Sequence, residues 1–266
     1  LFAARARDWA ETWEGSLGWG TPVYEHVLDR AKIGSGTRVL DCGCGAGRFP
    51  RMAADRGAIV AGIDAAASLI DIAAERTPEG DFRVGDLEAL PWPDDSFNVA
   101  ARFSSFQFAD NQTRALAEAR RVSHGYVAVV IPSRVADSGI TQVFKPLVPL
   151  FPAEAMESMK QSGMFALSEP GRLDRVLATA GLSPQHDDEV DCRIFFEDAN
   201  AAVRAFVGAG PTALAIQQSG EETVAGAVRG ALSVFTDSEG HVALPAWYRR
   251  CDLPSVSRPQ CIQESA

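Results

Sequence analysis

Apolar and polar positions follow two regular patterns over the first half of the chain, and each pattern predicts one kind of element. Almost continuous apolar runs at 37–42 and 58–63 are typical of strands buried on both faces of a parallel sheet. Between them, residues 48–57 place apolar side chains on one helical face, with Pro50 in the first turn and Gly57 at the end. The order strand, helix, strand predicts a right-handed crossover with the two strands parallel.

The same alternation continues along the chain. Further strands are expected at 191–198 and 241–250. Helices are expected at 65–77, 171–182, 199–207 and 221–235, with Asp198 as the N-cap of the third. The pattern predicts a doubly wound α/β fold with a seven-stranded, mostly parallel, Rossmann-like sheet and helical lid insertions.

Composition along the chain suggests four parts. We expect an N-terminal helical cap at 1–36, a nucleoside-binding core at 37–135, a lid insertion at 136–168, and a C-terminal part at 169–266 that completes the sheet and adds helices. The lid is expected because its residues are too apolar for an exposed linker. The apolar residues concerned are Phe144, Leu147, Val148, Leu150, Phe151, Met156, Met159, Met164 and Phe165.

Three glycines at alternate positions follow the first strand, and an acid ends the second. Gly43, Gly45 and Gly47 predict a tight turn that a ligand approaches at the backbone, next to a helix N-terminus. An acid about 20 residues after the turn, Asp64, is placed to accept from two ribose hydroxyls. A dinucleotide fingerprint G-x-G-x-x-G would need glycine where Arg48 stands, which disfavours a nicotinamide enzyme.

The run D-x-G-x-G-x-G at 41–47 resembles motif I of the class I S-adenosylmethionine-dependent methyltransferases. The resemblance continues through GIDAAASLI and covers about residues 39–131. VGDLEALPWPDDSFNVAARFSSFQF matches the third and fourth strands of the family, and ALAEARRV matches the helix before its fifth strand, at 126–132. The resemblance also implies that the strand at 241–250 is antiparallel. It is closest to bacterial small-molecule methyltransferases of the ubiquinone-biosynthesis and arsenite type. Two positions depart from the family: Asn98 stands where an acid is usual, and Ser123-His124-Gly125 replaces a Pro-Gly-Gly turn.

The resemblance implies a set of cofactor-binding residues. They are Asp41, Gly43, Cys44, Gly45, Gly47, Asp64, Ala65, Asp86, Leu87, Phe103 and Ser104. The cofactor would be S-adenosyl-L-methionine, which leaves as S-adenosyl-L-homocysteine. Asp64 would take the ribose diol, Asp86 the adenine amino group, and the Leu87 N–H a ring nitrogen. Asp41 would orient the turn within reach of the methionine ammonium, and Phe103 and Ser104 would offer that ammonium a carbonyl.

The sequence defines the part of the site that binds the methyl acceptor less well than the part that binds the cofactor. Four aromatic residues precede the first strand and either pack a helix on the sheet or wall the methyl-transfer pocket. They are Trp9, Trp13, Trp19 and Tyr24. No catalytic base stands out; His26 and His241 are the candidates, since His124 and His186 are expected at the opposite pole of the sheet. The lid predicts a mostly apolar pocket for a small acceptor.

Charge, motifs and cysteine content limit which partners, metals and cellular compartment are expected. A net charge of −10 opposes binding to phosphate backbones, and FSSFQF stands where methylases of nucleic-acid bases carry Asn/Asp-Pro-Pro-aromatic, so no nucleic acid is expected. No apolar run approaches the roughly 18 residues of a membrane span. Cys42 and Cys44 lack a second ligand pair, so no metal is expected. The five cysteines, an odd number, stand in a chain too large to need disulfides, so a reduced, cytoplasmic protein is expected. We also expect a monomer or homodimer.

The sequence thus predicts a methyltransferase that moves a methyl group from S-adenosylmethionine to a small-molecule acceptor. Two alternatives stay open: a protein that binds S-adenosylmethionine without transferring the methyl group, and, less favoured, a nicotinamide-dependent oxidoreductase. The sequence leaves open whether oxygen, nitrogen, carbon or sulfur is methylated.

Overall fold

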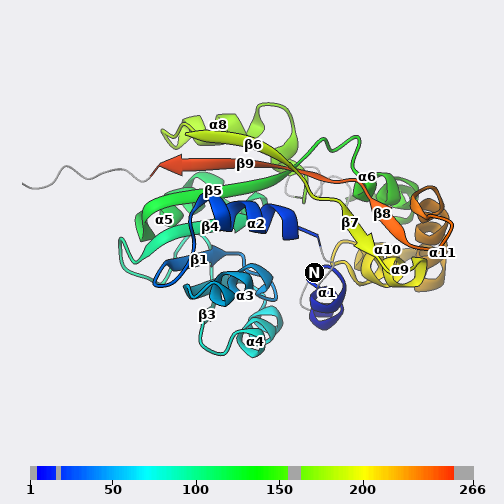
Figure 1. Cartoon of the computed structure of the whole chain (residues 1–266). Coiled ribbons are helices and arrows are strands. Elements are labelled where there is room, and N and C mark those ends of the chain that lie inside the picture. Colours follow the sequence, from blue (N-terminus) through cyan, green and yellow to red (C-terminus); the bar gives the residue numbers. More distant parts are fainter. Residues whose placement is uncertain (1–4, 16–18, 155–162, 255–266) are drawn as a thin grey trace, which may run out of the picture.

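A seven-stranded sheet forms the centre of the molecule in the computed structural model, which describes residues 5–15, 19–154 and 163–254 (Figure 1). The strand order is β3-β2-β1-β4-β5-β9-β6. The strands are β1 (Arg38–Cys42), β2 (Ile59–Asp64), β3 (Asp81–Val84), β4 (Phe97–Phe103), β5 (Ser123–Ser133), β6 (His186–Asp191) and β9 (Trp247–Pro254). β9 runs antiparallel to both of its neighbours, and the pairings among β1 to β5 are parallel, which confirms the predicted fold class.

Helices cover both faces of this sheet. The α-helices are α1 (Ala6–Thr12), α2 (Thr21–Arg30), α3 (Arg48–Asp55), α4 (Ala67–Arg76), α5 (Gln112–Val122), α6 (Gly139–Phe144), α8 (Arg172–Thr179), α9 (Ala199–Gly208), α10 (Thr212–Ser219) and α11 (Glu221–Leu232). Successive side chains of a strand point to opposite faces, so Val39 joins the core under α2 and α3 while Leu40 joins the core under α5 and α8. The near-continuous apolar runs of the sequence are therefore buried on two sides.

The glycine turn joins β1 to α3 as the sequence predicted. Gly43 and Cys44 both donate their N–H to the carbonyl of Ile63, at 2.7 and 3.0 Å, which ties the turn to the end of β2. Gly47 has φ +81°, and a Cβ there would lie 2.8 Å from the Cβ of Ala73 on α4. Glycine at this position therefore lets α3 start and lets α4 pack close beside it.

The sixth and seventh strands differ from the prediction. Of the segment 241–250, only residues 247–250 lie in the main sheet, as the start of β9. The apolar Ile194–Phe196 forms β7, which pairs with β8 (Val242–Leu244) in a separate two-stranded sheet. The sixth strand of the main sheet is instead the polar His186–Asp191, an exposed edge strand. Ion pairs such as Arg249 Nε to Asp187 Oδ1, at 2.8 Å, hold it to β9. The hydrophobic pattern did not predict this strand, because an edge strand buries few side chains.

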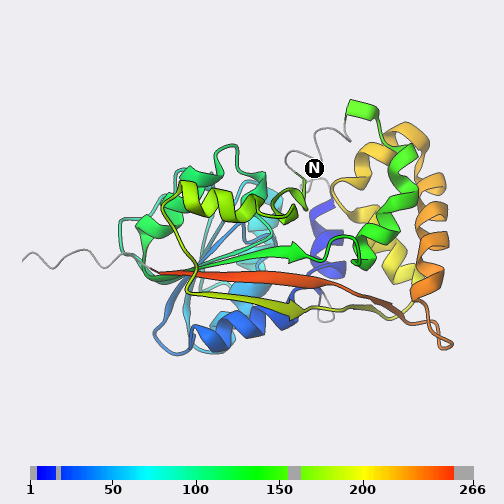
Figure 2. The same cartoon turned by 90° about the horizontal axis from the view of Figure 1, so that it is seen from above.

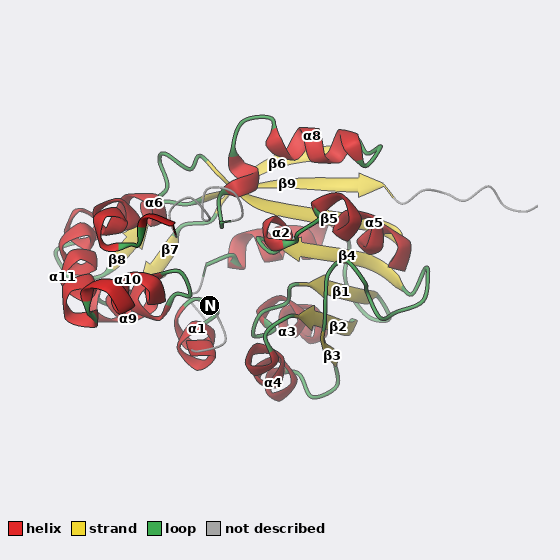
Figure 3. Cartoon of the chain, turned by 180° about the vertical axis from the view of Figure 1, so that it is seen from behind, coloured by secondary structure: helices red, strands yellow, loops and turns green. Residues whose placement is uncertain are grey.

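A second group of elements stands beyond the carboxyl ends of the parallel strands. This cap consists of α6, the 3₁₀ helix η3 (Lys145–Leu150), β7, β8 and α9–α11 (Figures 1 and 3). α1 lies between the cap and the sheet, in contact with α9 and α4 (Figure 2). Two elements of the expected lid, α6 and η3, therefore pack with helices that lie 50 or more residues further along the chain. The end of the expected lid, the 3₁₀ helix η4 (Ala166–Ser168), packs instead on β5 of the main sheet and on α8. The sequence did not predict α10.

The described apolar residues of the expected lid segment differ in their surroundings, and Val148 is exposed at 44%. Leu147 and Phe151 are buried in the core of the cap, as packing residues. Phe144 and Met164 line a cavity described below. Met156 and Met159 lie outside the described residues. Within the ranges that the structure describes, no helix is long and apolar enough to cross a membrane.

Candidate functional site

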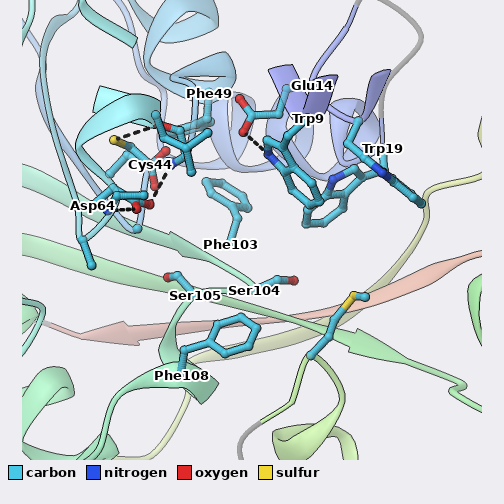
Figure 4. A pocket seen from close by; sticks show the side chains of 18 of the residues that line it. Trp9, Glu14, Trp19, Cys44, Phe49, Asp64, Phe103, Ser104, Ser105 and Phe108 are labelled. Carbon is cyan, nitrogen blue, oxygen red and sulfur yellow. Dashed lines mark hydrogen bonds between the residues drawn. The ribbon is translucent and has the colours of Figure 1, made fainter. Parts of the chain in front are cut away.

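A cavity of about 750 Å³ opens at the carboxyl ends of β1 to β4, under the cap (Figure 4). Residues at or just after the end of each of these strands line it: Gly43 after β1, Asp64 at the end of β2, Asp86 after β3 and Ser104 after β4. This is the place where open α/β sheets bind their ligands. The volume lies within the range of pockets that enclose small molecules.

Most of the residues predicted to bind the cofactor meet in this cavity. Those that line it are Asp41, Gly43, Cys44, Gly45, Asp64, Ala65, Asp86, Leu87, Phe103 and Ser104. Gly47 does not line it, because this glycine faces α4 and serves the packing of two helices. The fold thus assembles side chains that are more than 60 residues apart in the sequence.

Asp64 is the acid at the end of β2, and both of its oxygens accept backbone N–H groups. Oδ2 accepts from Gly45 at 3.0 Å and Oδ1 accepts from Ala66 at 2.9 Å. Burial raises the pKa of this carboxyl, and these hydrogen bonds partly offset the rise. A carboxylate oxygen can accept more than one hydrogen bond, so Asp64 supports the glycine turn and still has capacity toward the cavity.

Asp41 is buried beneath the turn at 3% exposure, and its Oδ1 has no hydrogen-bond partner among the described residues. Burial raises the pKa of Asp41 well above its ordinary value, and the negative charges of Glu14 and Asp64 raise it further. A buried carboxylate without a counter-charge is costly. The site therefore favours a cation at this position.

Asp86 and Ser104 are the predicted cofactor-binding residues that lie after β3 and β4. Asp86 is exposed, and its Oδ1 accepts from the N–H of Glu88 at 2.8 Å, which shapes the loop after β3. Ser104 has φ +49°, an unusual conformation for a residue with a side chain. Its carbonyl accepts from Gln107 Nε2 at 2.8 Å, and its buried Oγ has no partner in the described part of the chain. Strain of this kind is found mainly at functional sites.

Glu14 is a site residue that sequence reasoning missed. Its buried carboxylate accepts from the Trp9 Nε1 at 2.7 Å and from the backbone N–H groups of Ala46 at 3.0 Å and Arg48 at 3.2 Å, and it pairs with Arg76 at 3.2 Å. Burial raises the pKa of Glu14, and these donors offset part of the rise. The carboxylate therefore occupies the N-terminal amides of α3. The sequence shows Glu14 only as an acid directly after Trp13 in WAETWEG, with nothing to set it apart from the nearby Glu11.

Glu14→Ala is expected to destabilise the fold by about 1–3 kcal/mol, because several buried donors would lose their common acceptor. Urea denaturation followed by circular dichroism measures the loss. Glu11→Ala, which removes an exposed acid from α1, three residues before Glu14, is the control and should change stability by less than about 0.5 kcal/mol. Equal stability of the two variants would contradict the capping role of Glu14.

Aromatic residues wall the other half of the cavity. Trp9, Trp13, Trp19 and Tyr24 all line it, and the last three are also buried in the core. The N-terminal aromatic residues therefore pack in the core and also wall the cavity, which are the two roles that the sequence left open. The cap, the segment before η4 and the start of β9 complete this apolar wall. The residues concerned are Ile140, Phe144, Met164, Ala209, Pro211 and Tyr248.

Neither histidine proposed as a catalytic base lines the cavity. His26, on α2, lies beside Asp188 of β6, with 3.6 Å between Nε2 and Oδ2. His241 was expected at the cofactor end because its segment was assigned to the main sheet. It lies instead directly before β8 of the cap, exposed, with its Nδ1 3.3 Å from Asp237 Oδ2. The structure therefore gives neither residue a route to a ligand in this cavity.

Cysteines and acids do not gather into a metal site in the described ranges, where no group of three or more His, Cys, Asp or Glu side chains could hold an ion. Cys42, Cys44, Cys192 and Cys251 are buried free thiols. Burial raises the pKa of Cys42 to about 12, so this thiol stays protonated and packs as a small apolar group.

Comparison with known proteins gives a consistent picture. Residues 40–129 match the family described as methyltransferase domain. The malonyl-[acyl-carrier protein] O-methyltransferase of Serratia marcescens is 31% identical over 116 residues, which are 44% of this chain and 46% of that protein. The demethylmenaquinone methyltransferase of Renibacterium salmoninarum is 33% identical over 97 residues, 36% of this chain and 41% of that protein.

These alignments span less than half the length of either curated relative. Among solved structures, the YcgJ protein of Bacillus subtilis has a TM-score of 0.56 at 17% identity, over 87% of this chain and 97% of its own. At that identity the likeness concerns the fold alone.

Proposed function

We propose that the protein binds S-adenosylmethionine at the glycine turn and transfers its methyl group to a small-molecule acceptor under the cap, because residues 40–129 match the family described as methyltransferase domain. One observation carries the choice of cofactor. The turn presents carboxylates and not free amides: Asp41 is buried without a counter-charge, and Glu14 already occupies the amides of Ala46 and Arg48.

This electrostatic arrangement fits a methionine ammonium and opposes a pyrophosphate. A dinucleotide places its phosphates on the free N–H groups of the helix that follows the turn. Here the N-terminus of α3 carries the carboxylate of Glu14, which would repel a phosphate. The ammonium of the proposed cofactor would instead pair with Asp41. A nicotinamide dinucleotide would therefore lack the free N–H groups that its phosphates need.

The remaining predicted residues fit the nucleoside. Asp64 has acceptor capacity left for ribose hydroxyls, and Asp86 and Leu87 lie on the adjacent loop for the adenine. When bound, S-adenosylmethionine supplies a methyl group already activated by its sulfonium. The protein then mainly positions the acceptor in line with that methyl group and excludes water, which is the role we assign to the aromatic wall and the cap.

Asp64→Ala is expected to weaken S-adenosylmethionine binding by about 1–3 kcal/mol, the scale of a lost hydrogen bond to a charged group. The effect should lie toward the upper end, because Gly45 and Ala66 also lose their acceptor. Isothermal titration calorimetry measures the change. Asp71→Ala, which removes an exposed acid from α4, should leave the affinity unchanged. An Asp64→Ala protein that binds like the wild type would mean that this acid does not face the cofactor.

Methyl transfer itself is tested by release of S-adenosylhomocysteine in a screen of acceptors that includes the named substrates of the two relatives. Release that depends on an added acceptor supports the transferase. Tight binding of S-adenosylmethionine with no release over a broad acceptor panel would favour the alternative, a protein that binds the cofactor without transfer. Buried free cysteines support our proposal of a reducing, cytoplasmic setting.

A further inference from the structure

We infer that the hydroxyl of Tyr24 donates a hydrogen bond to the methionine carboxylate of S-adenosylmethionine, so that Tyr24 is a further cofactor-binding residue. This inference rests on the proposed function and adds one contact to the same site. The proposed function pairs the cofactor ammonium with Asp41 and the ribose with Asp64, and it leaves the carboxylate without a partner. Since the ammonium and the carboxylate stand on one carbon atom, the carboxylate must also lie near Asp41.

The amides of the glycine turn offer this carboxylate no free donor. Each N–H group from residue 43 to residue 48 already donates to an acceptor of the protein. The acceptors are the carbonyls of Ile63 and Cys44 and the carboxylates of Asp64 and Glu14. Among the described residues that line the cavity there is no lysine, arginine or histidine. A buried carboxylate without a donor is costly, so a neutral side-chain donor has to meet it.

Most other side-chain donors in the described part of the cavity wall are engaged or enclosed. Trp9, Trp13 and Ser105 donate to protein acceptors. Trp19 Nε1 and Ser104 Oγ have almost no accessible surface, so a ligand in the cavity does not reach them. The hydroxyls of two tyrosines remain, which have no hydrogen-bond partner among the described residues and are not enclosed in this way. These tyrosines are Tyr24 and Tyr248.

Tyr24 is the tyrosine on the side of Asp41. Asp41 lies opposite Ala101 of β4, and Phe103, two residues further on, faces the same side of the sheet. Tyr24 meets the ring of Phe103 edge-on, with 4.6 Å between the ring centroids and 83° between the planes. Burial raises the pKa of Tyr24 well above its ordinary value, and the negative charges of Glu14 and Asp41 raise it further. The hydroxyl therefore keeps its proton and acts as a donor.

Tyr248 belongs to another part of the cavity. It stacks on Trp19, with 5.3 Å between the ring centroids. Figure 4 shows Trp19 at the end of the cavity away from Asp64, with Phe103 between them. Of the two hydroxyls, that of Tyr24 is therefore the one beside the amino acid part of the cofactor.

The surroundings of Tyr24 hold this donor in place. Its ring packs against Phe103 and Phe49. A Cβ at Gly20 would lie 3.0 Å from the Oη of Tyr24, so the glycine leaves room for the hydroxyl. A donor fixed in this way loses little conformational freedom when a ligand binds.

S-adenosylmethionine and its decarboxylated form, which lacks only the carboxylate, test this contact. Both are titrated into the full chain by calorimetry. The wild type should bind S-adenosylmethionine at least as tightly as the decarboxylated form, because the carboxylate has a donor. Tyr24→Phe keeps the ring and removes the hydroxyl. It should bind S-adenosylmethionine about 10- to 100-fold more weakly than the wild type, the effect of a hydrogen bond to a charged group, and the decarboxylated form within about twofold.

Tyr126→Phe is the matched control. The hydroxyl of Tyr126 also has no partner among the described residues, but it is enclosed and Tyr126 does not line the cavity. This variant should keep both affinities within about twofold of the wild-type values, because the removed hydroxyl is remote from the ligand.

Three results would overturn the inference. The first is a wild type that binds the decarboxylated form more tightly than S-adenosylmethionine. The second is a folded Tyr24→Phe protein that binds S-adenosylmethionine as the wild type does. The third is a Tyr24→Phe protein that loses affinity for both ligands alike, which would make Tyr24 a packing residue. The wild-type comparison stands as a test even if the variant does not fold. A folded wild type that binds neither ligand would count against the proposed function instead, so the two failures are distinguishable.

Discussion

Asp41→Asn is expected to weaken S-adenosylmethionine binding by about 10- to 100-fold and, at the same time, to stabilise the unliganded protein. The weaker binding follows from the loss of a charge-assisted hydrogen bond to the ammonium, on the scale of about 1.5–3 kcal/mol. The gain in stability follows because the carboxylate is buried with an unpartnered Oδ1 beside Glu14 and Asp64. Calorimetry measures the first effect and thermal unfolding the second, at about 2–4 °C for each kcal/mol in a chain of this size.

The pH dependence of stability gives the same prediction an independent readout. Burial raises the pKa of Asp41 above its unfolded value, so the folded state holds this proton more tightly. Its contribution to stability is then present below the unfolded pKa of about 4 and is lost as the pH rises through the raised value. The unliganded wild type should lose stability over that window, and Asp41→Asn should lose less. Asp71→Asn, on the surface, should follow the wild type.

The affinity for S-adenosylmethionine should show the opposite dependence on pH. An ammonium beside Asp41 favours the ionised carboxylate, so S-adenosylmethionine affinity should rise with pH over the same window. An Asp41→Asn protein with unchanged affinity, and with the stability profile of the wild type, would show that this acid is neither buried as described nor part of the site.

Gly45→Val is expected to abolish detectable S-adenosylmethionine binding, a loss of more than about 100-fold. Gly45 has φ +54°, and a Cβ there would lie 2.4 Å from Glu14 Oε1, whose position other hydrogen bonds fix. The valine side chain would therefore displace Glu14 or reshape the turn that the ligand must approach. A positive φ is itself unfavourable for a β-branched residue.

Gly36→Val separates backbone strain from steric block. Gly36 also has a positive φ, +79°, but nothing lies within 4 Å of the Cβ that it would gain. It precedes β1 and does not line the cavity. This control should lose some stability and keep its S-adenosylmethionine affinity. If both variants lost affinity alike, the effect at Gly45 would be one of general destabilisation and not of the site.

The glycine turn and its surroundings could be predicted because local sequence dictates them. Gly43 and Asp64 stand at the ends of two apolar runs, and parallel strands bring such ends to one edge of a sheet. The core that Val39 and Leu40 build on opposite faces follows from the same runs. These features need no knowledge of distant parts of the chain.

The parts that sequence reasoning missed depend on contacts between distant segments. Glu14 meets Ala46 and Arg48 only once α1 has docked beside the sheet, and nothing in its local sequence distinguishes it from a surface acid such as Glu11. Trp13 is fixed by the carbonyl of Ala205, 192 positions away. Ile194–Phe196 has the composition of a central strand, yet its apolar face is buried by the cap and not by the main sheet.

Calorimetric titration of the full chain with S-adenosylmethionine and, separately, with NADH tests the central claim most directly. The account predicts saturable binding of S-adenosylmethionine with one site per chain and no measurable binding of NADH, because Glu14 holds the amides that a pyrophosphate would need. Binding of NADH as tight as that of S-adenosylmethionine, or no binding of S-adenosylmethionine by the folded protein, would contradict it.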